Sequence, residues 1–153
     1  MSTTVGRDEG GGHMRRSEDE ILAEELGALA ASTGAAGGLT RLVARWMKKN
    51  VHEIDLIVPL PFEDAVQRVV EVLVREGRAA DVPIADAVRD RQPIRVVVGA
   101  GYGGMNPVVV TALVTPGDEG GSGVSIRAAA KEGLVKQRAG EKTADRLAAL
   151  LRT

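Results

Sequence analysis

The sequence contains no cysteine and only three aromatic residues, Trp46, Phe62 and Tyr102. The absence of cysteine excludes a disulfide framework and any thiol chemistry. With so few aromatic side chains, the core must be built from valine, leucine, isoleucine and alanine. A cytoplasmic location is expected, because a chain without cysteine does not depend on an oxidising compartment for disulfide formation.

Other signals of function are also scarce. The chain has two histidines, no Gly-x-Ser-x-Gly elbow and no cysteine nucleophile, so the sequence assigns no catalytic residue, no metal ligand and no cofactor. The N-terminal segment lacks the apolar core of a signal peptide, and no apolar run approaches the length of a membrane span. These absences favour a binding protein over an enzyme.

What the chain does have is the composition of one ordinary globular domain. It contains 153 residues, of which 44% are hydrophobic and 27% charged. This length allows a core of useful size. The formal net charge is −1, and acidic and basic stretches alternate along the chain. Such alternation does not favour general nucleic-acid binding.

The N-terminal third differs from the rest in pattern. Residues 1–16 are polar and glycine-rich, which predicts a disordered tail. Residues 17–50 read as a helical arm, and residues 51–153 as an α+β domain. The arm begins with Ser17 and Glu20 at capping-box spacing, followed by an apolar helical pattern.

A second helix is expected over 39–49, after a glycine-rich break. Its apolar residues fall on one face, and its cationic residues lie off that face. This pattern suits docking on a membrane surface or a partner groove. It equally suits packing against the protein's own sheet, which we favour.

The α+β domain shows a clear order of elements. A strand over Ile54–Val58 leads into a helix with an apolar stripe from Phe62 to Leu73, which ends near Gly77. A short helix is expected within 82–91. Three strands and a closing helix follow, the strands being Ile94–Val98, Val108–Val114 and Val124–Ala130. The order α-α-β-α-β-β-β-α predicts a two-layer sandwich, with an antiparallel sheet of about four strands packed by helices.

The glycine cluster at 99–104 matches the G-x-G-x-x-G fingerprint of a dinucleotide-binding turn. That fingerprint requires the third glycine to open a helix. Here Gly104 leads instead into a run of β-branched residues, Val108 to Thr111, which opposes a helix. We therefore interpret the cluster as a glycine-rich hairpin connection.

Two polar segments remain as alternatives. The connector 131–142 gathers cations around two glycines before the last helix, and an anion could bind there. Its candidate anion-binding residues are Lys131, Lys136, Arg138 and Lys142. The segment "HEID" places His52, Glu53 and Asp55 together, but three ligands without a distant partner are weak support for a metal site. An exposed strand entry is the simpler interpretation.

Two stretches resemble helix-grip folds, which include the SRPBCC ligand-binding superfamily. They are "IDLIVPLPFEDAVQRVVEVL", a strand and then a helix, and "VSIRAAAKEGLVKQRAGEKTADRLAALL", a strand, a linker and the final helix. The resemblance implies a curved antiparallel sheet around a C-terminal helix, although the final helix is short here. TATA-binding-protein-like domains match the same order. "GGMNP" and "AAKEGLVKQ" also look like segments of uncharacterised small bacterial proteins, which implies no activity.

The leading hypothesis is a non-enzymatic domain that binds an apolar small molecule or a protein partner between sheet and helices. Its candidate lining residues are Val66, Val70, Val110, Leu113, Leu147 and Leu151. The alternative is a nucleotide- or anion-binding protein or enzyme that uses the 99–104 glycine loop and the 131–142 connector.

Overall fold

A five-stranded antiparallel sheet forms the centre of the computed structural model, which describes residues 15–32, 47–100, 106–132 and 138–153. The spatial order of the strands is β1-β5-β4-β3-β2. The strands are β1 (Lys48–Val58), β2 (Arg78–Ala79), β3 (Ile94–Ala100), β4 (Asn106–Pro116) and β5 (Ser122–Glu132). The helices are α1 (Glu18–Ser32), α3 (Phe62–Glu76), α4 (Ile84–Arg89) and α5 (Ala139–Arg152).

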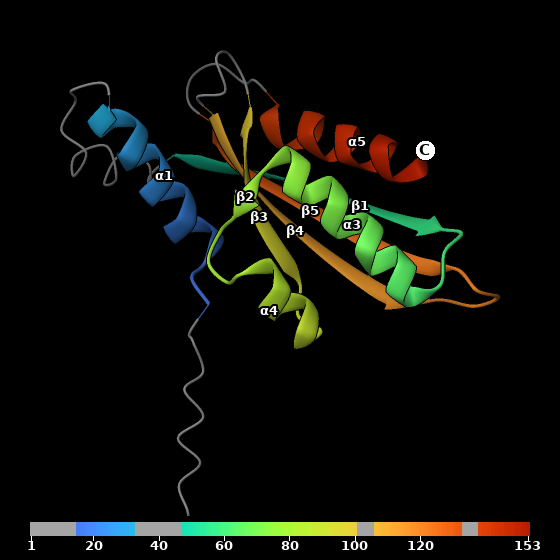
Figure 1. The fold of residues 1–153 in the computed structure, drawn as a ribbon. Coiled ribbons are helices and arrows are strands. Elements are labelled where there is room, and N and C mark those ends of the chain that lie inside the picture. Colours follow the sequence, from blue (N-terminus) through green and yellow to red (C-terminus); the bar gives the residue numbers. More distant parts are fainter. Residues whose placement is uncertain (1–14, 33–46, 101–105, 133–137) are drawn as a thin grey trace, which may run out of the picture.

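This architecture confirms the predicted α+β class, with an antiparallel sheet packed by helices (Figure 1). The strand count is five rather than about four, because the two-residue β2 adds an edge to β3. The first strand lies beside the last along its whole length, from Lys48 opposite Glu132 to Val58 opposite Ser122. The closing helix α5 then lies across the sheet, as the helix-grip resemblance implies.

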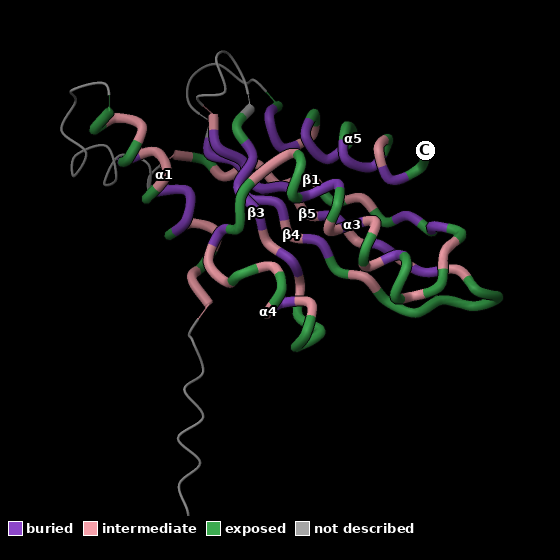
Figure 2. Tube along the Cα trace, viewed as in Figure 1, coloured by how far each residue is buried: buried purple, intermediate pink, exposed green. Residues whose placement is uncertain are grey.

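The main core lies between one face of the sheet and the helices α3, α4 and α5. Successive residues of a strand point to opposite faces, so the even-numbered residues of β3, β4 and β5 form this face. Val96, Val108, Val110 and Ala128 are fully buried there. Figure 2 shows the buried positions along the strands and on the sheet-facing sides of α3 and α5. Small aliphatic side chains therefore build this core, as the scarcity of aromatics requires.

Helix α1 packs on the opposite face of the sheet. Its Ile21 and Leu22 are almost completely buried against Val97, Val109 and Ala129. The predicted capping box starts the helix. The Ser17 hydroxyl accepts a hydrogen bond from the Glu20 amide at 3.2 Å, and the Glu20 carboxylate accepts one from the Ser17 amide at 2.9 Å.

The N-terminal boundaries differ from the prediction. β1 begins at Lys48, so residues 48 and 49 of the expected helix 39–49 are in a strand, and the expected boundary between 50 and 51 falls inside β1. Residues 39–46 lie outside the described residues. Arg15 and Arg16, expected in the tail, donate hydrogen bonds to the carbonyls of Pro93 and Ala80, while residues 1–14 are not described. No helix in the described ranges is long and apolar enough to cross a membrane.

Candidate functional site

The six residues predicted to line a ligand site do not share one environment. Val110, Leu147 and Leu151 belong to the packed core, with at most 7% of their surface exposed. Val66 and Val70 are half-buried on α3. Leu113 lies on the other face of the sheet and is 40% exposed. The structure brings Val66 and Leu113 to the wall of one cavity and leaves the three core residues away from it.

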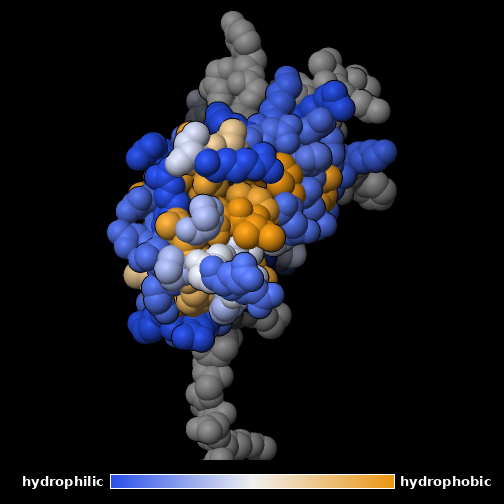
Figure 3. Space-filling model, turned by 90° about the vertical axis from the view of Figure 1, so that its right-hand side faces the viewer, coloured by the Kyte–Doolittle hydropathy of each residue, from blue (hydrophilic) through white to orange (hydrophobic). Residues whose placement is uncertain are grey.

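This cavity lies between the N-terminal turns of α3, the end of α4 and the strands β3 and β4. Its volume is about 340 Å³, which is at the small end of the range for ligand sites in proteins. Its apolar wall consists of Phe62, Val66, Val88, Ile94, Ala112 and Val114, and Leu113, whose side chain points to the other face, borders it with its backbone. Hydrophobic residues gather, framed by hydrophilic ones, at the end of the molecule where α3 begins (Figure 3).

A small residue in the sheet helps to create this space. Ala112 of β4 is paired with Ile94 on β3 and with Ile126 on β5. Its side chain is a single methyl group between two larger neighbours, so the sheet is indented under the start of α3. The floor of the cavity thus includes a position of the sheet at which the side chain is small.

The mouth of the cavity is polar. Glu63 comes from the first turn of α3, and Arg89, Arg91 and Gln92 come from the end of α4 and the segment that follows it. An apolar wall with a few polar groups at its opening is the usual composition of a small-molecule site. It can enclose an apolar group and orient a polar one.

A second hollow lies on the outer face of the sheet, in the half that α1 leaves uncovered. It is lined by Asp55, Leu56, Ile57, Leu113, Thr115, Gly123, Val124 and Ser125. Ile57 is 82% exposed there, the most exposed of the large hydrophobic residues in the described ranges. This hollow is wide and shallow, and it lacks the enclosing helices of the α3–α4 cavity.

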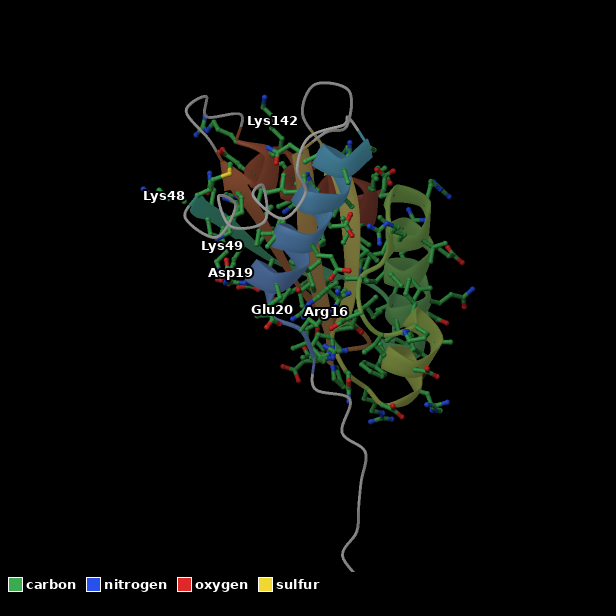
Figure 4. The ribbon with its side chains drawn as sticks, turned by 90° about the vertical axis from the view of Figure 1, so that its left-hand side faces the viewer. Arg16, Asp19, Glu20, Lys48, Lys49 and Lys142 are labelled. Carbon is green, nitrogen blue, oxygen red and sulfur yellow. The ribbon has the colours of Figure 1, made fainter. Side chains whose placement is uncertain are left out.

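The predicted anion-binding residues do not converge. Lys131 is buried, and its ammonium group forms a 2.6 Å ion pair with Asp19 of α1. Arg138 forms an ion pair with Glu141 at 2.8 Å, and Lys136 lies outside the described residues. Lys142 is exposed near the start of α5 (Figure 4). The cations of the connector that are described therefore have internal partners or lie alone.

Lys131 instead helps to hold α1 on the sheet. Asp19 also pairs with Lys49 of β1 at 3.3 Å, and Glu18 pairs with Arg127 of β5 at 2.7 Å. Figure 4 shows Asp19 and Lys49 close together where α1 crosses the sheet. The hydrogen bond from Lys131, together with the positive charges of Lys131 and Lys49, holds the pKa of Asp19 below its ordinary value. The acidic first turn of α1 is thus matched to a basic row on β1 and β5.

These contacts predict a pH-dependent docking of α1. Because the folded state lowers the pKa of Asp19, its contribution is complete above the ordinary pKa of about 4 and is lost as the pH falls through the lowered value. Asp19→Asn should reduce the stability at pH 6 by at most about 1 kcal/mol, since the carboxylate is half exposed. Hydrogen exchange of the Ile21 and Leu22 amides measures the docking. A difference between variant and wild type that persists unchanged at pH 2 would contradict this assignment.

The glycine cluster is part of a hairpin. β3 ends at Ala100, β4 begins at Asn106, and these two residues are paired in an antiparallel ladder. Residues 101–105 lie outside the described residues. A strand rather than a helix follows Gly104, so the crossover helix of a dinucleotide site is not present. The hairpin interpretation of the sequence is confirmed.

The segment "HEID" does not form a metal site. His52 approaches Asp145 of α5 at 3.8 Å, whereas Glu53 pairs with Arg127 on the other face of the sheet. Within the described ranges, no group of three or more histidine, aspartate or glutamate side chains is placed to hold a metal ion.

Sequence reasoning missed most of the cavity. Val88, Arg91, Gln92 and Ala112 were not among the candidates, because they come from two segments, the end of α4 with the residues that follow it and β4, that share no spacing with the residues of α3. One usable signal was Phe62, one of only three aromatic residues, placed at the start of the most regular helix.

Comparison with known proteins leaves the family open. No protein-family model matches the sequence, and no curated protein matches it either. Among solved structures, that of Ara h 8.0201 is similar, with 10% sequence identity and a TM-score of 0.39 over 68% of this chain and 93% of that one. A likeness of this size supports no inference about function.

Proposed function

We propose that this protein binds an apolar small molecule in the cavity between α3, α4 and the sheet. The observation that supports the proposal is the cavity itself, about 340 Å³ in volume, which is lined by apolar side chains together with four exposed polar residues. It lies between sheet and helices, where the sequence hypothesis placed a ligand. No covalent step is involved.

Burial of apolar surface would drive this binding. The wall offers the partly exposed side chains of Phe62, Val66 and Val88 to a ligand, above the buried Ile94 and Ala112. Each methylene transferred from water to such a wall contributes about 0.8 kcal/mol. In a series of linear alcohols, the affinity should therefore rise about fourfold per carbon until the chain fills the cavity.

Titration with 1-octanol, followed by calorimetry and by amide NMR shifts, tests the proposal. Saturable binding should shift the amides of Val66, Val88 and Ile94. Val66→Trp places an indole in the cavity and should weaken binding at least tenfold. The matched control is Val74→Trp, because Val74 lies on the same helix, is 56% exposed and does not line the cavity.

The possible results separate clearly. Loss of binding in Val66→Trp but not in Val74→Trp supports the proposal. No saturable binding, or binding that both variants leave unchanged, contradicts it. If Val66→Trp does not fold, Ala112→Leu fills the same cavity from the sheet side and takes its place.

A further inference from the structure

The polar groups at the mouth of the cavity differ in how far their charges are already balanced. Four polar residues line it: Glu63, Arg89, Arg91 and Gln92. Which chemical group a ligand presents at this mouth depends on the proposed function, namely that the cavity binds an apolar molecule.

One of the charges has partners within the protein. Arg89 is paired with Asp86 at 3.1 Å and with Asp90 at 3.3 Å. Glu63 lies in the first turn of α3, where the helix dipole and the free backbone amides favour a negative charge. Arg89 therefore requires no ligand to balance it, and the carboxylate of Glu63 limits how much negative charge the mouth can accept.

Arg91 is different. Its guanidinium carbon lies 5.5 Å from the centre of the Phe62 ring, so the cation is held over an aromatic face at the cavity mouth. No carboxylate within the described ranges is paired with it. A guanidinium stacked in this way keeps the N–H groups at its edge available to an acceptor.

The backbone conformation at Arg91 is also unusual. Its φ angle is +52°, in the left-handed region, directly after the residue that ends α4. Glycine is the usual residue at such a position, since any side chain there costs free energy. This turn directly after α4 sets where the side chain of Arg91 starts relative to the cavity mouth.

We propose that the cavity takes an apolar molecule ending in a carboxylate, with the carboxylate on the guanidinium of Arg91. The apolar body would lie against Val66, Ile94 and Ala112. The side-chain amide of Gln92 is at the same mouth and can donate a further hydrogen bond. One unbalanced cation beside Glu63 suits a single negative charge better than a phosphate dianion.

Octanoate, 1-octanol and octylamine share a chain length and differ in the end group, so they test the proposal directly. At pH 7 and low salt, octanoate should bind about tenfold more tightly than octanol, and octylamine more weakly than either. Arg91→Gln should remove the preference for octanoate, so that this variant binds octanoate and octanol equally. Arg75→Gln is the control, because Arg75 is an exposed cation in the last turn of α3, away from the cavity.

The outcomes distinguish this inference from the proposed function. If octanol binds and octanoate binds no better, the inference is wrong and the apolar site remains. The inference also fails if Arg91→Gln and Arg75→Gln weaken octanoate binding equally, since that would show a general charge effect. If no probe binds, both proposals fall. Thermal unfolding of each variant verifies that the fold is kept.

Discussion

Leu147→Ala is expected to lower the free energy of unfolding by about 2–5 kcal/mol. Leu147 has no exposed surface and belongs to the core cluster between α5 and the sheet. Removing its branched end leaves a void among valines and alanines, whose short side chains have little reach to fill it. Urea denaturation at pH 7, followed by far-ultraviolet circular dichroism, measures the change.

The matched control for that variant is Leu150→Ala. Leu150 lies one turn further along α5 and is only partly buried, so its truncation should cost clearly less. The comparison also separates packing from ligand contact, because the sequence hypothesis placed Leu147 in a ligand site. Equal losses in the two variants, or a rise in octanol affinity with little loss of stability, would show that Leu147 lines an open space.

Gly77→Ala is expected to destabilise the protein by about 1–3 kcal/mol. Gly77 ends α3 with an extended backbone that alanine can also adopt. The cost is steric, because a Cβ atom there would lie 2.6 Å from the carbonyl oxygen of Val97 on β3. Relief requires the end of α3 to move from the sheet or the β2–β3 pairing, in which Arg78 lies opposite Val97, to shift. Urea denaturation gives the stability, and hydrogen exchange at Val97 shows whether the pairing loosens.

Gly121→Ala is a suitable comparison for Gly77→Ala. A Cβ atom at Gly121 would meet its nearest neighbours at 3.4 Å, an ordinary van der Waals distance. This variant should stay within about 0.5 kcal/mol of the wild type. If both substitutions cost the same, the effect would come from the loss of glycine in general and not from the contact with Val97.

The best-predicted elements are those whose own residues mark the start, the buried face and the end of the element. α3 has an apolar stripe, acids in its first turn, Arg75 in its last turn and Gly77 at its end, and the structure confirms it as Phe62–Glu76. The strands predicted from Ile94 and from Val108 were equally clear, because each contains a run of buried β-branched residues. In these segments local propensity and tertiary environment agree.

The sequence-based predictions were wrong for segments whose secondary structure is determined by tertiary contacts. The first residues of β1, Lys48 to Glu53, are mostly polar, so no alternation of apolar residues marked them as a strand. They are held in the sheet by pairing with β5, more than 70 positions later in the sequence. The two residues of β2 are exposed and have no pattern of their own.

The candidate site could be predicted only as a general location. The expectation of a ligand between sheet and helices rested on apolar patterns, and those patterns do not distinguish a filled interior from a cavity. The outcome depends on the size of single residues, such as Ala112 in its row of the sheet, and on a backbone angle at Arg91. Neither property is visible before the segments are assembled.

The two faces of the sheet have a consequence for the order of folding. α1 precedes in the chain all the strands that it packs on: its partners lie on β1, β3, β4 and β5, and Glu18 reaches Arg127 across 109 positions of sequence. β1 likewise cannot pair in the sheet until β5 has been synthesised. The N-terminal third therefore has no surface on which to fold until most of the chain has been synthesised, and sheet closure and α1 docking are late steps of folding.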